Sequence, residues 1–303
     1  MKIINQEAVY MPHDIHPYNF IEKCARTCYK SEDKITDDSA IKMVKVLAMA
    51  KHLTTLEHEY LYFDLVDYTH IDFIKDTHPM FLRYINIGHK YISGSFRAFM
   101  ELFENDTSII TLEMESILHN TYPEIFTRSV PSKNIGIKLV TRNKVVNDPE
   151  EYHTIRLIPH TVKFTTSRAI ANELVRHRAN ITFSQESQRY VDYGTDKNNR
   201  QITVIYPLID PDTNAYNDWH YAMLMAETQY MNLRKAGIKP EIARGVLPND
   251  CKTEIVVTAT EQEWQHIINL RYHGTTGSPH PQMKELMGLI YPKIVKETNG
   301  RVQ

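Results

Sequence analysis

Two guanidinium groups and an imidazole stand on consecutive residues at Arg176, His177 and Arg178. The three residues end a segment whose apolar positions recur at helical spacing. Successive helical residues point about 100° apart, so these side chains cannot share one face and would serve different partners. A guanidinium is planar and offers five donors, which suits phosphate or carbonyl recognition. The triplet therefore indicates an anion site, with a solvated basic helix end as the simpler alternative for any isolated Arg-His-Arg.

Short hydroxyl and amide side chains fill the loop expected next, over residues 179–190. They offer many donors and acceptors for an anion or for the edge of a pyrimidine. Ser187 is also a candidate nucleophile, but no histidine–acid pair is evidently placed to activate it, which favours a hydrogen-bonding role. These residue types leave the identity of the ligand open. The polar residues of this loop are Asn180, Thr182, Ser184, Gln185, Glu186, Ser187, Gln188 and Arg189.

A second polar cluster lies between a predicted helix and a predicted strand, and it contains His52, Glu57 and His58. Imidazole and carboxylate groups are common metal ligands, so these residues support the hypothesis of a metal-dependent hydrolase. No third histidine or aspartate completes a ligand spacing, and a polar helix-to-strand connection explains the cluster more simply. Taken singly, Arg244 and Arg271 are typical of surface charges.

The chain has 303 residues, of which 42% are apolar and 24% charged, as in an ordinary globular protein. Its formal net charge of -2 gives no sign of nucleic-acid or membrane affinity, so an anion site must be a local concentration of Arg and His. No stretch approaches the ~20 apolar residues of a membrane span, and the first residues lack a basic-then-apolar signal. Three cysteines are too few for a disulfide scaffold and fit a reducing cytoplasm, where we expect this protein. Cys24 and Cys28, one helical turn apart, are interpreted as core thiols rather than zinc ligands.

No dinucleotide fingerprint, Walker loop or nucleophile elbow occurs in the sequence. A Rossmann fold would bind a dinucleotide through a glycine-rich turn at a helix N-terminus. If a dinucleotide cofactor binds this chain, it is therefore held in another way.

The elements that must position these residues follow from apolar periodicity and from capping signals. Ser167 is a good helix cap, and Thr260 with Glu263 forms a capping box. Mixed helices and antiparallel-looking strands predict an α+β fold, with a central mostly antiparallel or mixed sheet and packed helices, as a single domain over 1–303. The proline-interrupted segment 105–153 has thin apolar content and is interpreted as an insertion within that domain. Helices are predicted over 18–29, 39–51, 71–84, 95–103, 109–119, 168–175, 212–236, 240–244, 260–271 and 282–297, and strands over 2–5, 58–67, 161–165, 201–206 and 253–258.

The triplet and the Ser187-Gln188-Arg189-Tyr190 block, separated by eight residues, resemble the signature of flavin-dependent thymidylate synthases. Further blocks resemble that family in the same order and cover almost the whole chain except 105–153. They are Cys24 to Tyr29, His52 to His58, Ile92 to Phe99, Ala243 to Pro248 with Lys252-Thr253-Glu254, and Trp264 to Arg271 with His280 to Met283.

The resemblance implies conversion of dUMP to dTMP with methylenetetrahydrofolate as carbon donor, FAD as hydride carrier and NADPH as reductant. It also implies a homotetramer whose flavin pockets lie between subunits, and no enzyme nucleophile, so Cys251 is not expected to attack the pyrimidine. Arg271 is expected to polarise the uracil, and Ser187 to hydrogen-bond near the phosphate with Arg189. By position the flavin-holding residues are Arg176, His177, Arg178, His52, Thr54, Cys28 and His266, and the dUMP-holding residues are Gln185, Glu186, Ser187, Arg189, Arg244 and Arg271.

Three positions depart from the family pattern. Thr260 stands where a flavin-contacting Asn is usual, Glu173 where some members have a Gln near dUMP, and Cys28 where a Ser is common. Two other function classes stay open on residue types alone. They are the metal-dependent hydrolase with His52, Glu57 and His58, and a nonenzymatic nucleotide- or RNA-binding module built on the Arg-His-Arg loop.

Overall fold

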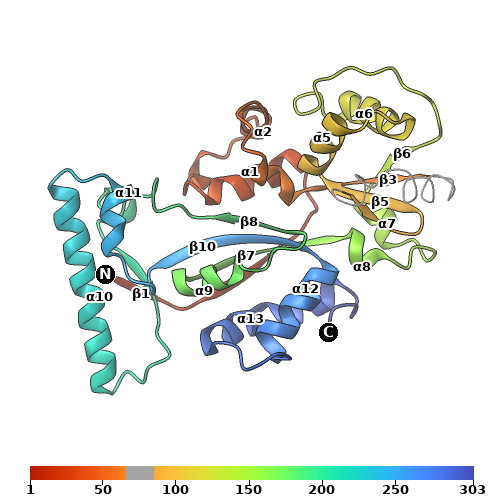
Figure 1. Cartoon of the computed structure of the whole chain (residues 1–303). Coiled ribbons are helices and arrows are strands. Elements are labelled where there is room, and N and C mark those ends of the chain that lie inside the picture. Colours follow the sequence, from red (N-terminus) through yellow and green to blue (C-terminus); the bar gives the residue numbers. More distant parts are fainter. Residues whose placement is uncertain (66–84) are drawn as a thin grey trace.

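The computed structural model describes residues 1–65 and 85–303 and has an α+β architecture, as predicted (Figure 1). The strands form two four-stranded antiparallel sheets and one parallel pair. The expectation of one central sheet is therefore wrong: three separate hydrophobic clusters hold three groups of strands. The predicted helix over 71–84 and the end of the strand over 58–67 lie outside the described residues.

The longer sheet crosses the middle of the molecule in the order β2 (Glu7–Met11), β7 (Pro159–Ser167), β10 (Lys252–Thr260) and β8 (Ile181–Gln185). Side chains of a strand alternate between its two faces. Ile255 and Val257 of β10 accordingly pack in one cluster with α9 (Arg168–Leu174), α12 (Glu261–Ile268) and α13 (Pro281–Glu297). Val256 packs on the opposite face against Phe20 and Cys24 of α1 (Pro17–Thr27). Figure 1 shows these helices on the two sides of the sheet.

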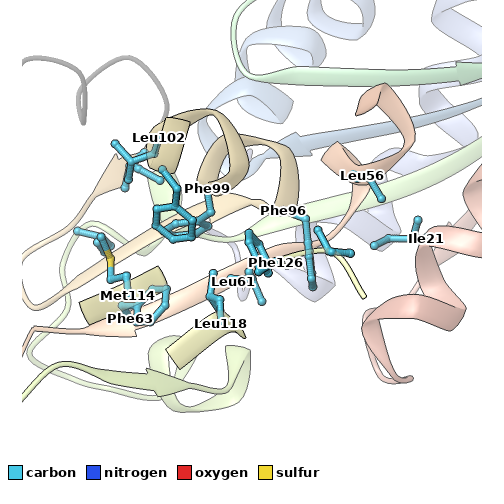
Figure 2. Close-up of a cluster of buried hydrophobic side chains, with 14 of the residues drawn as sticks. Ile21, Leu56, Leu61, Phe63, Phe96, Phe99, Leu102, Met114, Leu118 and Phe126 are labelled. Atoms are coloured by element: carbon cyan, nitrogen blue, oxygen red, sulfur yellow. The ribbon is translucent and has the colours of Figure 1, made fainter. Parts of the chain in front are cut away.

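The second sheet has the order β4 (Asn86–Ile87), β5 (Tyr91–Ser95), β3 (Tyr60–Asp64) and β6 (Lys138–Val140). The helices α5 (Phe96–Asn105) and α6 (Ile109–Thr121) pack on it, with α2 (Ser39–Met49) completing the cluster. Figure 2 shows Met114, Leu118 and Phe126 among its buried side chains. Residues of the 105–153 segment are therefore part of this core. Whether the segment is an insertion stays a prediction.

The parallel pair joins β1 (Lys2–Ile4) to β9 (Thr203–Ile205). The long helix α10 (Asn214–Lys235) stands beyond the strand ends at one edge of the molecule (Figure 1). It leads through Gly237, whose φ of +81° suits glycine, into α11 (Pro240–Ala243). The remaining short elements are η1 (Glu32–Lys34), η2 (Leu53–His58), α7 (Arg142–Val146), α8 (Thr154–Leu157), η3 (Asp196–Asn198), η4 (Arg244–Val246) and the π-helix η5 (Asn269–His273).

Three local expectations fail for physical reasons. The loop predicted over 179–190 contains β8, whose inward residues are polar and therefore lack the apolar alternation of a half-buried strand. Thr260 is the N-cap of α12, as predicted, but its side chain accepts no hydrogen bond from the helix, so the capping box is absent. The helix predicted to reach 271 widens into the π-helix η5 from Asn269. No described helix combines the length and apolar character needed to cross a bilayer.

Candidate active site

The Arg-His-Arg triplet lies at the C-terminal end of α9, as its sequence position predicts. The Ser167 hydroxyl caps the start of this helix by accepting a hydrogen bond from the Ile170 N–H. After Leu174 the chain turns, so Arg176 and Arg178 are exposed while His177 is buried. The three side chains therefore differ in their exposure to solvent.

A cavity of about 600 Å³ opens between this helix end and the segment from α12 to η5. Arg176, His177 and Arg178 line one side of it, and His266 and Arg271 line the other. The rings of His177 and His266 meet edge to face, with centroids 5.7 Å apart. Three arginines and two histidines thus surround this cavity. They make it a donor-rich environment for an anionic or carbonyl-bearing ligand.

Arg271 is fixed by three hydrogen bonds before any ligand is considered. Its Nε donates to His177 Nε2 at 3.0 Å, its Nη1 to a carboxylate oxygen of Glu173 at 3.0 Å, and its Nη2 to the Glu173 carbonyl at 3.3 Å. Burial, reinforced by Arg271, His266 and Arg176, lowers the pKa of His177 from 6.5 to about 4. His177 is therefore neutral at pH 7 and accepts a hydrogen bond through Nε2. Glu173, the departure from the family pattern, holds the guanidinium of Arg271 directly.

Two further cavities continue from the first along the neighbouring strands. One of about 290 Å³ shares Arg178 and Ile181 with the first cavity and is also lined by Arg97. Arg97 in turn lines a cavity of about 440 Å³. Because each cavity shares lining residues with the next, they form one row. The last cavity of the row is lined by Cys28, Tyr29, Leu47, Lys51, His52, Leu53, Thr54 and Thr55 in addition to Arg97.

The row brings together all seven residues expected to hold a flavin. His177 and His266 lie at one end, and His52, Thr54 and Cys28 lie at the other. Cys28 is half-buried, whereas Cys24 is fully enclosed, so only Cys24 is the core thiol that the sequence predicted for both. Thr260 lies on a separate cavity of about 300 Å³ that shares Gln262 and Glu263 with the first.

The residues expected to hold dUMP do not gather in one place. Arg271 is near the Ile181 end of β8, whereas Ser187 and Arg189 follow its Gln185 end. Five strand residues separate these ends by about 13 Å. The Ser187 hydroxyl accepts from the Arg189 N–H at 3.3 Å, and the Ser187 N–H donates to the Cys28 carbonyl at 3.0 Å.

Three other predicted nucleotide contacts have distinct surroundings. Gln185 donates to the Thr253 hydroxyl at 3.3 Å. Glu186 is 2% exposed, and its carboxylate binds Lys252 at 2.6 Å and the Tyr193 hydroxyl at 3.0 Å, so it faces the interior rather than a cavity. Arg244 lies where α11 meets η4, and its guanidinium has no ion pair or hydrogen bond to the described residues.

The side chains of His58 and Glu57, from the cluster considered for a metal-dependent hydrolase, form hydrogen bonds with other parts of the protein. Both ring nitrogens of His58 are engaged, Nδ1 with the Thr258 hydroxyl at 2.7 Å and Nε2 with the Ser184 hydroxyl at 2.8 Å. Glu57 accepts from Arg97 at 2.6 Å and from Thr182 at 2.8 Å. Within residues 1–65 and 85–303, no group of three or more His, Cys, Asp and Glu side chains is placed to hold a metal ion.

Sequence reasoning assigned no role to Arg97, which lines two of the three cavities in the row. Its guanidinium bridges Glu57 and Glu101, with both contacts at 2.6 Å, and so ties η2 to α5 beside Arg178. The available signal was the helical i, i+4 spacing of Arg97 and Glu101 within a family-like block. That spacing predicts an ordinary surface ion pair between Arg97 and Glu101. The contact of Arg97 with Glu57 depends on the fold and could not be predicted from the spacing.

The sequence of the chain matches the model of a known protein family. The model of the thymidylate synthase complementing protein family, Thy1, matches residues 141–298, just over half of the chain. The chain belongs to this family. Arg176, Ser187, Arg244 and Arg271 all fall within the matched residues, whereas the second sheet and the cavity at His52 precede them.

Members of the Thy1 family with curated descriptions resemble only part of the chain. A flavin-dependent thymidylate synthase of Pyrococcus abyssi is 36% identical over 105 residues, which are 35% of this chain and 42% of that protein. A probable flavin-dependent thymidylate synthase of Paramecium bursaria Chlorella virus 1 is 29% identical over 152 residues, 45% of this chain and 69% of that protein. The match therefore spans about two fifths of the length of the Pyrococcus relative. Among solved structures, a UMP/dUMP methylase, PolB, of Streptomyces cacaoi bound with 5-Br dUMP aligns with 100% of this chain and 96% of its own at 13% identity, with a TM-score of 0.45.

Proposed function

We propose that this Thy1-family chain is a flavin-dependent thymidylate synthase that converts dUMP to dTMP. Methylenetetrahydrofolate would donate the carbon, FAD would carry the hydride and NADPH would reduce it, and we expect the enzyme to work in the cytoplasm. The observation that carries the proposal is the row of cavities that joins Arg176, His177 and Arg178 to His52 and Thr54.

The residues along this row fit a flavin dinucleotide. The guanidinium groups of Arg176 and Arg178 are exposed and have no ion pair or hydrogen bond within the described chain, so both are available to a diphosphate. His177 is neutral and its Nε2 already accepts from Arg271, so its Nδ1 carries the proton and can donate a hydrogen bond to the ligand. The three cavities are neighbours that share Arg178, Ile181 and Arg97, and an extended ligand would lie along them past Arg97.

The chemistry assigned to the protein is orientation and charge stabilisation. Reduced FAD supplies a hydride when bound. Arg271 lines the first cavity and has two N–H groups left beside its three hydrogen bonds, and these would stabilise negative charge on a pyrimidine carbonyl. Cys251 is unsuited to nucleophilic attack, because burial, with Glu186 nearby, raises the pKa of its thiol to about 12.

The distribution of the dUMP residues supports a site shared between subunits. Arg271 and the pair of Ser187 and Arg189 lie at opposite ends of β8, so one chain does not present them to one nucleotide. A symmetric assembly brings the Ser187 end of one chain to the Arg271 end of another. We therefore propose a homotetramer, with Arg189 and Arg244 binding the phosphate from the second chain.

Arg176→Ala is expected to purify without flavin, because it removes one of the two unpaired guanidinium groups of the first cavity. The measurement is the visible absorbance of the purified variant, before and after addition of FAD and of dUMP. Arg200→Ala is the matched control, since Arg200 is an exposed arginine paired with Asp196 on η3. Full flavin occupancy in Arg176→Ala would show that this residue has another role.

The proposed reaction itself is tested with the unaltered protein. It should be yellow, and it should couple NADPH oxidation to dTMP formation from dUMP and methylenetetrahydrofolate. A protein that takes up no FAD and binds no dUMP would overturn the proposal.

A further inference from the structure

The carboxylate of Glu263 is a buried acidic group without a partner among residues 1–65 and 85–303. Glu263 is 8% exposed, and its oxygens form no hydrogen bond or ion pair with these residues. Burying an unpaired carboxylate costs free energy, so such a group in a folded protein needs an explanation. Burial accordingly raises the pKa of Glu263, and the nearby His266 offsets this only in part.

The Glu263 side chain lies where two cavities meet. It lines the first cavity, of about 600 Å³, and also the cavity of about 300 Å³ that contains Thr260, hereafter the Thr260 cavity. In a capping box, the side chains of Thr260 and Glu263 would each accept from the other's backbone N–H. The Thr260 hydroxyl accepts no such bond, although the residue is buried. Both polar groups line the Thr260 cavity instead.

The first turn of α12 is held in place from behind this cavity. Glu261, which directly follows Thr260, is fully buried and accepts two hydrogen bonds of 2.7 Å from the guanidinium of Arg301. A third contact joins it to His160 Nε2 at 3.1 Å. Because these contacts fix the start of the helix, Glu263 is a preorganised acceptor for a ligand.

The Thr260 cavity is lined by residues of both four-stranded sheets. Ile85 and Ile87 come from the second sheet, and Thr260 ends β10 of the longer one. The short helix α8 lies between α12 and the second sheet (Figure 1). Its Arg156 donates to the side-chain oxygen of Gln262 at 3.2 Å at the exposed rim. The cavity thus has a polar floor, apolar side chains on one wall and a polar rim.

The donors and acceptors of this cavity suit an amino-substituted purine. No group of three or more His, Cys, Asp and Glu side chains in the described ranges could hold a metal ion, so an N–H donor is the partner that Glu263 lacks. A carboxylate accepts from an exocyclic amino group, and amide side chains pair with the N6 and N7 edge of adenine. The volume is at the low end of the usual range of about 300–1,000 Å³ for ligand pockets, which suits a single base. Three lining residues supply amides: Asn86, Asn180 and Gln262.

The adjoining cavity supplies a place for phosphate. Gln262 and Glu263 line the Thr260 cavity and also the first cavity, which contains Arg176 and Arg178. A nucleotide with its base at Glu263 would extend its phosphate toward these two guanidinium groups, which suit it by charge and geometry.

We propose that the Thr260 cavity binds the adenine ring of a nucleotide and that Glu263 accepts a hydrogen bond from its exocyclic amino group. Neither the family resemblance nor the proposed reaction assigns Glu263 a role. Two sources supply this ring, the adenine end of FAD and a free adenine nucleotide, and only the first rests on the proposed function.

Recognition of the amino group is tested by calorimetric titration of the full chain with AMP and with IMP, after removal of any bound flavin. IMP has a carbonyl oxygen where AMP has the amino group, and this oxygen would face the Glu263 carboxylate. We expect AMP to bind at least about tenfold more tightly, the usual order of discrimination for a contact to a base edge. Equal affinities, or no binding of either nucleotide, would overturn the proposal.

The role of Glu263 itself is tested with Glu263→Met, which keeps the length of the side chain and removes the carboxylate. We expect the preference for AMP over IMP to disappear. The denaturation midpoint should stay the same or rise, because an unpaired buried charge is removed, whereas the loss of a structural residue would lower it. Glu285→Met is the matched control, since Glu285 is an exposed glutamate of α13 that binds Gln6. A preference for AMP that persists in Glu263→Met contradicts the assignment.

The source of the ring is identified by competition. If FAD supplies it, AMP displaces FAD, and Glu263→Met weakens the binding of FAD but not that of FMN, which lacks adenine. If AMP and FAD bind together, the site takes a free adenine nucleotide. A chain that binds AMP through Glu263 but takes up no FAD would refute the proposed function and leave this inference standing.

Discussion

Arg271→Ala is expected to lower dTMP formation by roughly 10²- to 10³-fold, the usual loss when one donor to developing negative charge is removed. The protein should remain yellow, because Arg176 and Arg178 do not depend on Arg271 for their positions. The affinity for dUMP should fall as well. Steady-state turnover, dUMP titration and flavin absorbance measure these three effects separately.

The variant Arg271→Lys and the titration of His177 separate the effect of the Arg271 charge from the effect of its geometry. Arg271→Lys keeps the positive charge but cannot reach His177 and Glu173 together, so it should restore only part of the turnover. Because Arg271 is the charged group that most lowers the pKa of His177, this pKa should rise from about 4 toward 6.5 in Arg271→Ala. Unchanged turnover in Arg271→Ala would refute the assigned role, and an unchanged His177 titration would refute the coupling.

Regular elements were predictable where a local pattern is sufficient. The apolar stripe of Ile41, Val44 and Leu47 predicts α2, and Ser167 predicts the start of α9, because periodicity and capping involve residues within one or two turns. The strand β8 was not predictable in this way. Its inward Thr182 and Ser184 bond to Glu57 and His58, so their burial depends on η2, more than a hundred residues away in sequence.

In the candidate site, too, contacts between residues far apart in sequence could not be predicted from local patterns. A family signature places Arg176 and Ser187 in one motif, whereas β8 holds them at opposite ends of a strand. The opposite case is Arg97, which looks like half of a surface ion pair until the fold brings Glu57 to it. Motifs therefore indicated which residues bear chemistry. The grouping of those residues depends on strand pairing and on assembly, which sequence spacing does not encode.

Glu254→Ala is expected to lower the free energy of unfolding by about 3 kcal/mol, the low end of the cost of stranding buried charges. Glu254 lies on β10, and its carboxylate contacts Lys252 at 2.8 Å, Lys163 at 2.6 Å and also Lys30. Removing it leaves three ammonium groups close together in a partly buried place. Equilibrium denaturation measures the loss, and Asp196→Ala, which breaks an exposed ion pair with Arg200, is the control that should cost less than about 1 kcal/mol.

The same cluster predicts how the free energy of unfolding changes with pH: the contribution of Glu254 is lost as the pH falls. Burial alone would raise the pKa of Glu254, but Lys252, Lys163 and Lys30 outweigh it and hold this pKa well below its ordinary value of 4.5. The unfolded chain therefore binds the proton first as the pH falls. The stabilising contribution is complete above pH 4.5 and is lost progressively below it. In Glu254→Gln this part of the dependence should vanish, so the unfolding free energy should fall less steeply with acid below pH 4.5 than in the unaltered protein. Parallel curves for the two proteins would show that Glu254 carries no shifted proton equilibrium.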